Sequence, residues 1–272
     1  MERWLTMERL LMLELSAGGC TVEAVLNGMP LATIGPAGGS KSLAVHEYTL
    51  AGRNRLSLVV SPPPIGTNPP SQPRVAIGPT WARARLVLVG QGQSPADPGV
   101  RALGVVEWAT AEGKTYEAPS THGRDVDLPV TFPRWRWLDA PPIAITPAVQ
   151  RTALEFVQQL AVELGRGNAE SLIAASKLRF DEMALAYQID VAAVLQRFRD
   201  HLQRLYAANA LKITPPVAAE LVLRPLVDGR LIECLTPAGG AVLRTQNEST
   251  DLGDHAWPIR MAMVEGRIYV LR

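Results

Sequence analysis

The sequence has few cysteines, few histidines and few charged residues, and each shortage disfavours a class of function. Its 272 residues include two cysteines and four histidines. Cys20 and Cys234 lie far apart, and neither has a partner at metal-ligand spacing, so a disulfide framework and a structural zinc site are both disfavoured. We expect both to be small buried hydrophobic residues. Charged residues make up only 19% and the net charge is +1, which provides no basic footprint for nucleic acid or for an anionic membrane.

Long apolar runs are also missing. No stretch approaches the roughly 20 apolar residues that a membrane-crossing helix needs. Residues 15–20 loosely match a lipoprotein cleavage box, but Glu2, Glu8 and Glu14 interrupt the stretch that leads to it. A signal peptide needs an unbroken apolar region. We therefore expect a cytoplasmic protein, and the alanine-, arginine- and proline-rich composition is typical of a bacterium with a GC-rich genome.

Hydrophobic residues make up 47% of the chain, enough for two cores, and the first half reads as strands. Short apolar runs separated by glycine and proline turns predict an antiparallel β-sandwich over residues 1–138. The clearest signal is Asn27-Gly28 between the runs 21–26 and 29–34, because this dipeptide favours a two-residue hairpin turn. The other expected strands cover residues 10–15, 42–48, 55–60, 82–89 and 105–110.

Residues 22–60 also carry a familiar pattern. The Asn-Gly hairpin is followed by a glycine-rich stretch and then by alternating Tyr48, Leu50, Gly52, Asn54 and Leu56. This pattern resembles the jelly-roll modules that are attached to many glycosidases. The resemblance implies a jelly-roll-like fold in which Gly52 and Asn54 shape a turn.

The pattern changes after a proline-rich linker at residues 139–147. Thr146 followed by Pro147 predicts a helix start, with a side-chain oxygen at the N-cap and a fixed φ at the first helical position. Apolar residues then recur every three or four positions up to residue 164. Asn168 and Asp190 predict the starts of two further helices, with another between them around residues 180–187.

Strands return after residue 216. The dipeptides Asp228-Gly229 and Glu265-Gly266 predict two hairpins, and the expected strands cover residues 221–227, 230–235, 241–245, 257–264 and 267–271. Helices followed by an antiparallel meander that ends in a Tyr-containing strand resemble the NTF2-like superfamily of cone-shaped α+β domains. The expected fold class is therefore α+β with two domains, a sandwich at 1–138 and an NTF2-like domain at 148–272.

The segment at residues 134–137 has the most unusual local composition. As a strand it would place Trp135 and Trp137 on one face and Arg134 and Arg136 on the other. Exposed indole rings could stack on a sugar or anchor a protein interface. The alternative is that the tryptophans cover a core or the region between the domains.

Other candidate binding residues lie in the second half. His255 follows Asp254, so the two could form an acid–base pair, and Trp257 and Tyr187 complete the set of candidates. The chain contains no nucleophile elbow, phosphate loop, dinucleotide fingerprint or zinc-peptidase motif. We expect no catalytic residue, no metal and no cofactor.

These observations favour a non-enzymatic bacterial factor of the immunity, adaptor or secretion-accessory type. Its partner is expected to be another protein rather than nucleic acid or a membrane. Two alternatives stay open: a carbohydrate-binding module that uses exposed tryptophan, and a small-molecule enzyme that uses a pocket in the second half.

Overall fold

The computed structural model describes residues 9–65, 67–90, 92–128, 132–246 and 255–272. Within these residues the chain is a mixed α+β protein with several antiparallel sheets, and it divides into two compact units. The first, which we call the sheet unit, contains the described residues up to Arg134 except Pro64 and Ile65. The second, which we call the mixed unit, contains those two residues and the described chain from Trp135 onwards. The mixed unit therefore begins before the linker predicted at residues 139–147.

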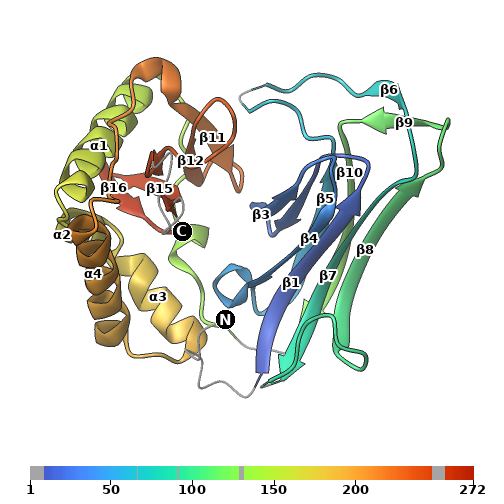
Figure 1. Ribbon diagram of the computed structural model, residues 1–272, viewed down its shortest axis with the longest axis horizontal. Coiled ribbons are helices and arrows are strands. Elements are labelled where there is room, and N and C mark those ends of the chain that lie inside the picture. The colour runs from blue at the N-terminus through green and yellow to red at the C-terminus, as the bar shows by residue number, and fades with distance from the viewer. Residues whose placement is uncertain (1–8, 66, 91, 129–131, 247–254) are drawn as a thin grey trace. The chain divides into compact units, whose positions relative to one another are not determined.

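The sheet unit contains two four-stranded antiparallel sheets (Figure 1). The strands of the first are, in spatial order, β4 (Gly39–Ala44), β1 (Arg9–Gly18), β7 (Thr80–Gly90) and β8 (Arg101–Thr110). The strands of the second are β10 (Ser120–Leu128), β5 (Gly52–Val60), β2 (Val22–Leu26) and β3 (Met29–Ile34). Two short strands, β6 (Gln72–Val75) and β9 (Thr115–Ala118), pair with each other.

One hydrophobic core lies between the two sheets. It joins alternate residues of β1 and β7, such as Leu13 and Leu86, to alternate residues of β5, such as Leu56 and Leu58. All four side chains are fully buried. Because side chains alternate across a strand, the intervening residues of β1 and β7 point away from this core.

The predicted Asn27-Gly28 hairpin is confirmed. Both residues have positive φ, 52° and 79°, as a tight two-residue turn requires. The Asn27 side chain also donates hydrogen bonds of 2.8 Å to the backbone oxygen of Tyr48 and to Oδ1 of Asn54. Asn54 in turn bonds the backbone of Leu50 and Gly52 and so shapes the turn before β5, as the sequence pattern implied.

The mixed unit contains the four predicted helices. They are α1 (Pro147–Gly165), α2 (Glu170–Ala175), α3 (Lys177–Tyr187) and α4 (Val191–Ala207). The Thr146 hydroxyl accepts the N–H of Val149, and the Asp190 carboxylate accepts the N–H of Ala192, so both predicted caps are confirmed. None of the helices in the described residues is long and apolar enough to cross a membrane.

An antiparallel sheet follows the helices. Its strands are, in spatial order, β11 (Val222–Leu226), β12 (Leu231–Leu235), β15 (Ile259–Val264) and β16 (Arg267–Val270). A separate pair is formed by β13 (Leu243–Arg244) and β14 (Ala256–Trp257). Apolar residues of α1, such as Val157 and Leu160, share one core with Ile232 and Met261 of the sheet. Both predicted hairpin turns have positive φ at their Asp-Gly and Glu-Gly positions.

Both cysteines are buried and free, as predicted. Burial raises the pKa of Cys20. Burial and the neighbouring Glu233 carboxylate raise the pKa of Cys234 to about 12. Neither thiol is therefore poised as a nucleophile, because reactive cysteines need a lowered pKa and some exposure.

The strand predicted for residues 134–137 is not formed. Trp135 is extended, but Arg136–Leu138 forms a short 3₁₀ helix. The backbone N–H of Arg136 donates a hydrogen bond of 2.7 Å to the Glu182 side chain of α3 instead of pairing with another strand. Both tryptophan side chains are 0% exposed.

Candidate functional site

The predicted candidates that the structure describes are spread along the chain rather than gathered in one site, and all of them except Arg134 belong to the mixed unit. Trp135, Trp137 and Tyr187 are buried, whereas Arg134 and Arg136 are exposed. Trp257 is half-buried on β14 and packs against the core of the mixed unit. Asp254 lies outside the described residues. Whether any of these residues binds a partner stays a prediction.

Trp135 belongs to a buried charged cluster. The guanidinium of Arg272 lies 5.6 Å from the centre of the Trp135 ring and 2.6 Å from the carboxylate of Glu182. Only 1% of the Arg272 side chain and 10% of the Glu182 side chain are exposed. A cation over an indole face and a buried ion pair both hold side chains in place. The Trp135 ring is thus buried beside this ion pair.

His255 faces a second histidine that sequence reasoning had not singled out. Its ring centre lies 5.0 Å from that of His201 on α4, in an edge-to-face arrangement. Burial, together with the nearby His255 and Arg204, lowers the pKa of His201. No cluster of three or more metal-ligating side chains occurs in the part of the chain that the structure describes.

The His201 environment predicts a loss of stability in acid. Because the folded protein lowers the pKa of His201 below its ordinary value of about 6.5, the unfolded state binds a proton first as the pH falls. The lowered pKa of His201 therefore has little effect on the free energy of unfolding at pH 7, and it decreases that free energy as the pH falls below about 6.5. Urea denaturation between pH 7.5 and 5 should show a smaller decrease in unfolding free energy for His201→Asn than for the unaltered protein. His122→Gln in the sheet unit is the control, and equal slopes for all three proteins would refute the assignment.

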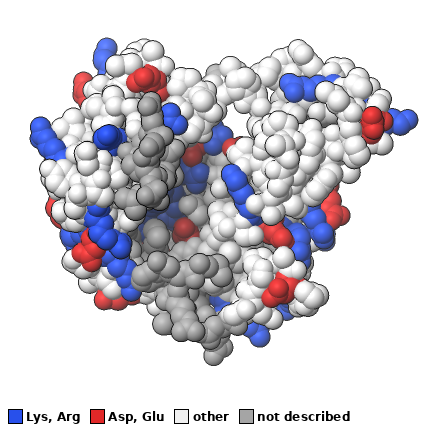
Figure 2. All heavy atoms as spheres, in the orientation of Figure 1, with Lys and Arg blue, Asp and Glu red and all other residues white. Residues whose placement is uncertain are grey.

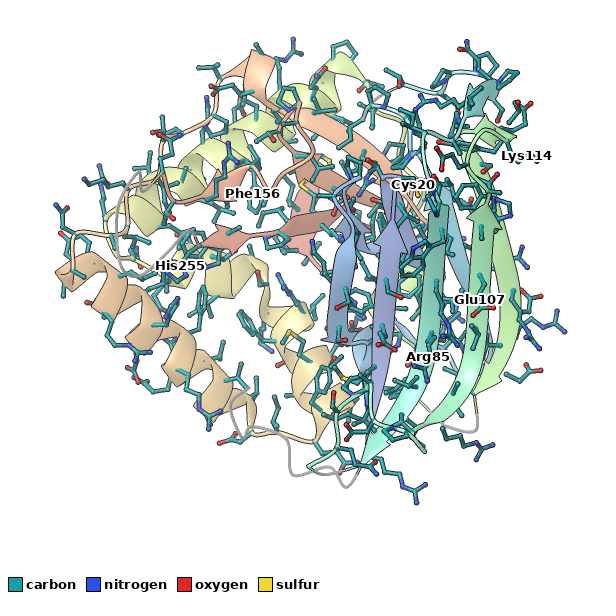
Figure 3. All side chains as sticks on the ribbon, turned by 45° about the vertical axis from the view of Figure 1, so that its right-hand side comes forward. Cys20, Arg85, Glu107, Lys114, Phe156 and His255 are labelled. Atoms are coloured by element: carbon teal, nitrogen blue, oxygen red, sulfur yellow. The ribbon has the colours of Figure 1, made fainter. Side chains whose placement is uncertain are left out.

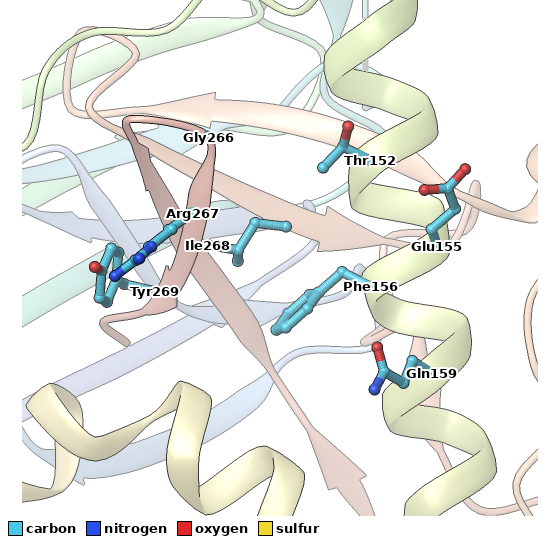
Figure 4. Close-up of a pocket in the computed structure, with 8 residues that line it drawn as sticks. All are labelled: Thr152, Glu155, Phe156, Gln159, Gly266, Arg267, Ile268 and Tyr269. Carbon is cyan, nitrogen blue, oxygen red and sulfur yellow. The ribbon is translucent and has the colours of Figure 1, made fainter.

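A groove of about 550 Å³ lies beside α1 in the mixed unit (Figure 4). Thr152, Glu155, Phe156 and Gln159 line it from the helix, and residues 266–269 line it from the β15–β16 hairpin. The Ile268 side chain points across the groove towards α1, whereas the side chains of Arg267 and Tyr269 point away from α1. Neither Tyr187 nor His255 lines this groove. Of the acid–base groups in the enzyme hypothesis, the two that the structure describes therefore lie outside this groove.

The outward face of the first sheet in the sheet unit holds a different arrangement. Trp81, Arg83 and Arg85 alternate along β7 with the buried residues Ala82 and Ala84, so all three point away from the core. We call this surface, with Glu14 of β1 and Glu107 of β8, the Trp81 face. Figure 3 shows Arg85 and Glu107 on these neighbouring strands. A hollow of about 510 Å³ on the sheet is lined by Trp81, Arg83, Glu107 and Ala109, among others.

The indole of Trp81 lies over small residues. Its neighbours in the strand register are Gly18 on β1 and Ala109 on β8. A Cβ atom at Gly18 would lie 2.9 Å from Nε1 of the ring, which shows that the indole packs directly against the glycine. The residue is nevertheless 42% exposed. One side of the ring is thus supported by the sheet while a large part of the residue stays open to solvent.

Two cross-strand ion pairs follow Trp81 along the same face. Arg83 bonds Glu107 at 2.8 Å, and Arg85 bonds Glu14 at 3.0 Å. The first pair is well exposed and the second is mostly buried, with 20% and 16% of the side chains exposed. Each pair joins residues that lie opposite each other in the register. Hydrogen-bond donors from the arginines and acceptors from the glutamates therefore alternate on this face, and the two positive charges balance the two negative ones.

The face ends at a small apolar cluster. Met12, Val87 and Val89 continue the outward rows of β1 and β7, yet Val87 is fully buried. Val100, from the segment between β7 and β8, packs against these residues. That segment is held by its own turns, with hydrogen bonds from Ser94 N–H to the Asp97 carboxylate and from Val100 N–H to Asp97 O. It forms a wall across the end of the sheet face.

Sequence reasoning passed over Trp81, although the signal was present. Residues 81–85 read Trp-Ala-Arg-Ala-Arg, in which small and large residues alternate. Such alternation places the large side chains on one face of a strand. On the face of the molecule that Figure 2 shows, acidic and basic side chains are interspersed.

Comparisons with protein-family models, with curated proteins and with solved structures find no match for the chain. The geometry of its own residues therefore carries the functional argument.

Proposed function

We propose that the chain is a non-enzymatic carbohydrate-binding protein whose Trp81 face holds a neutral saccharide. The observation that carries this proposal is the indole supported by Gly18 beside a charge-balanced row of hydrogen-bonding side chains. The proposal keeps the carbohydrate hypothesis from the sequence but moves it from Trp135 and Trp137 to Trp81.

The chemistry of the face suits a sugar. The face of an aromatic ring carries partial negative charge and attracts the weakly positive C–H groups on one side of a pyranose. The hydroxyl groups at the rim of the same sugar need both donors and acceptors, and the Arg83–Glu107 pair offers both. Hydrogen bonds to charged groups are stronger than neutral ones. A cancelled net charge favours a neutral ligand over an anionic or cationic one.

The finer fold assignments are part of the same proposal. Two four-stranded antiparallel sheets on one core support a jelly-roll-like sandwich for the sheet unit. Helices followed by the β11-β12-β15-β16 sheet support an NTF2-like assignment for the mixed unit. Neither assignment fixes a function, since one fold hosts many activities.

The direct test measures binding before and after loss of the indole. Neutral cello-, xylo-, manno-, malto- and chito-oligosaccharides are titrated into the protein by calorimetry. We expect at least one series to bind, and Trp81→Ala to weaken its affinity about 10-fold or more, which corresponds to about 1.4 kcal/mol. Tyr206→Ala removes an aromatic residue that is 52% exposed in the mixed unit, and it should leave the affinity unchanged. Equal affinity in the Trp81→Ala protein would reject the proposal.

The other hypotheses from the sequence stay predictions. A protein partner could occupy the groove beside α1, but its lining combines one glutamate and one arginine with uncharged polar and apolar residues and favours no particular occupant. The exposed indole and the balanced charges of the Trp81 face, by contrast, favour a neutral ligand with both an apolar face and hydroxyl groups. We therefore place carbohydrate binding first.

A further inference from the structure

The geometry points to a carbohydrate site that is closed at one end, so that it takes the end of a chain and holds two or three sugar units. This inference rests on the proposed carbohydrate function and specifies the form of its ligand. It is carried by the spacing of the outward rows and by the wall at Val100.

The spacing sets the length of the site. Trp81, Arg83 and Arg85 are successive outward residues of β7, each pair separated by one inward alanine. At about 3.3 Å per residue, the distance along the strand from Trp81 to Arg85 is about 13 Å. A pyranose ring with its linkage oxygen is about 5 Å long at bond lengths near 1.5 Å. The polar rows therefore match between two and three sugar units laid along the strand.

The wall closes the end beyond Arg85. The next outward residue of β7, Val87, is fully buried, and Val100 packs with it and with Met12. A sugar chain that lies along β7 cannot continue over Val87 without displacing this segment. Because the covered residues are all apolar, their exposure would also cost free energy in water.

The opposite end is open. β7 begins at Thr80, one residue before Trp81, and β1 ends at Gly18, which lies beside the ring. Ile77 and Pro79, which precede β7, are exposed. Sugar units that extend past Trp81 would leave the sheet and gain no further outward row. The affinity should thus increase with the length of the oligosaccharide up to about three units and stay constant beyond that length.

Chain length and end labels test this inference. The probes are neutral oligosaccharides of one to six units from the series named above, each titrated into the whole protein. For the series that binds, we expect the affinity to rise at least 10-fold from one unit to three and to change less than twofold from three to six. A trisaccharide with a bulky fluorophore at one end should bind as before, and the same label at the other end should weaken binding at least 10-fold.

The outcomes separate this inference from the function on which it rests. If affinity keeps rising to six units, or if both labelled ends are tolerated, the closed site is wrong while Trp81-dependent binding still supports the function. If a single unit binds as tightly as three, the length argument is wrong. If no series binds, the proposed function fails and this inference fails with it.

Discussion

Replacing Gly18 by valine is expected to weaken carbohydrate binding as strongly as removal of the Trp81 ring, by about 10-fold or more. A Cβ atom at this position would lie 2.9 Å from Nε1 and 3.5 Å from Cε2 of the indole, so the ring must tilt away from the sheet. Gly18 lies at the end of a strand and its φ is not in the left-handed region, so the backbone accepts valine without strain. The substitution thus moves the platform while it keeps every other side chain of the face.

Calorimetric titration with the saccharide that the unaltered protein binds measures the effect. We expect at least a 10-fold loss of affinity for Gly18→Val. Gly35→Val is the matched control, because a Cβ at Gly35 meets no atom within 4 Å and its backbone is equally permissive. Unchanged binding in the Gly18→Val protein would mean that the position of the ring on the sheet does not matter. The Trp81 face would then lose its central argument.

The parts of the fold that could be predicted are those encoded by local signals. Asn27-Gly28, Thr146-Pro147 and Asp190 each act within a few residues, and the structure places a turn or a helix start at all three. A turn dipeptide restricts φ and a cap satisfies an unpaired N–H, whatever the rest of the chain does. These features can therefore be predicted from the sequence alone.

The missed strands lack such signals. β10 (Ser120–Leu128) contains a glycine, an arginine, a histidine and two aspartates, and most of its residues are not fully buried. It is a strand because its backbone pairs with β5 at the edge of the second sheet. An edge strand needs fewer apolar residues than a central one, and charged residues on it discourage unwanted pairing. Its residues pair with residues of β5 that lie between 60 positions (Ser120 with Val60) and 76 positions (Leu128 with Gly52) earlier in the chain, so a local pattern cannot predict the pairing.

The exposure of the tryptophans could not be predicted for a related reason. Tryptophan content drew attention to Trp135 and Trp137, but exposure depends on what packs against a side chain. Glu182 and Arg272, both distant in sequence, lie in the cluster that contains Trp135. At Trp81 the opposite holds, because Gly18 and Ala109 beside it are too small to cover the ring. The identities of neighbours on adjacent strands decide which tryptophan is open, and they are known only when the register is known.

The buried Glu182–Arg272 pair leads to the largest expected effect on stability. Glu182→Gln keeps an oxygen that can accept the Arg136 N–H, but it removes the carboxylate charge that lies 2.6 Å from the buried Arg272 guanidinium. Removing one partner of a buried ion pair typically costs about 3–5 kcal/mol. We expect a loss of this size in urea denaturation of the mixed unit. The saccharide affinity of the sheet unit should stay the same wherever the protein is folded.

The neighbouring residue on the same helix is the control. Asp181 pairs with Lys177 at 2.8 Å, but 45% and 75% of these side chains are exposed. Asp181→Asn should therefore cost less than about 1 kcal/mol, since solvent screens an exposed pair. The double variant Glu182→Met, Arg272→Met removes both buried charges and should recover much of the stability that Glu182→Gln loses. If instead the double variant is no more stable than Glu182→Gln, the cost comes from lost packing around Trp135 rather than from an unpaired charge.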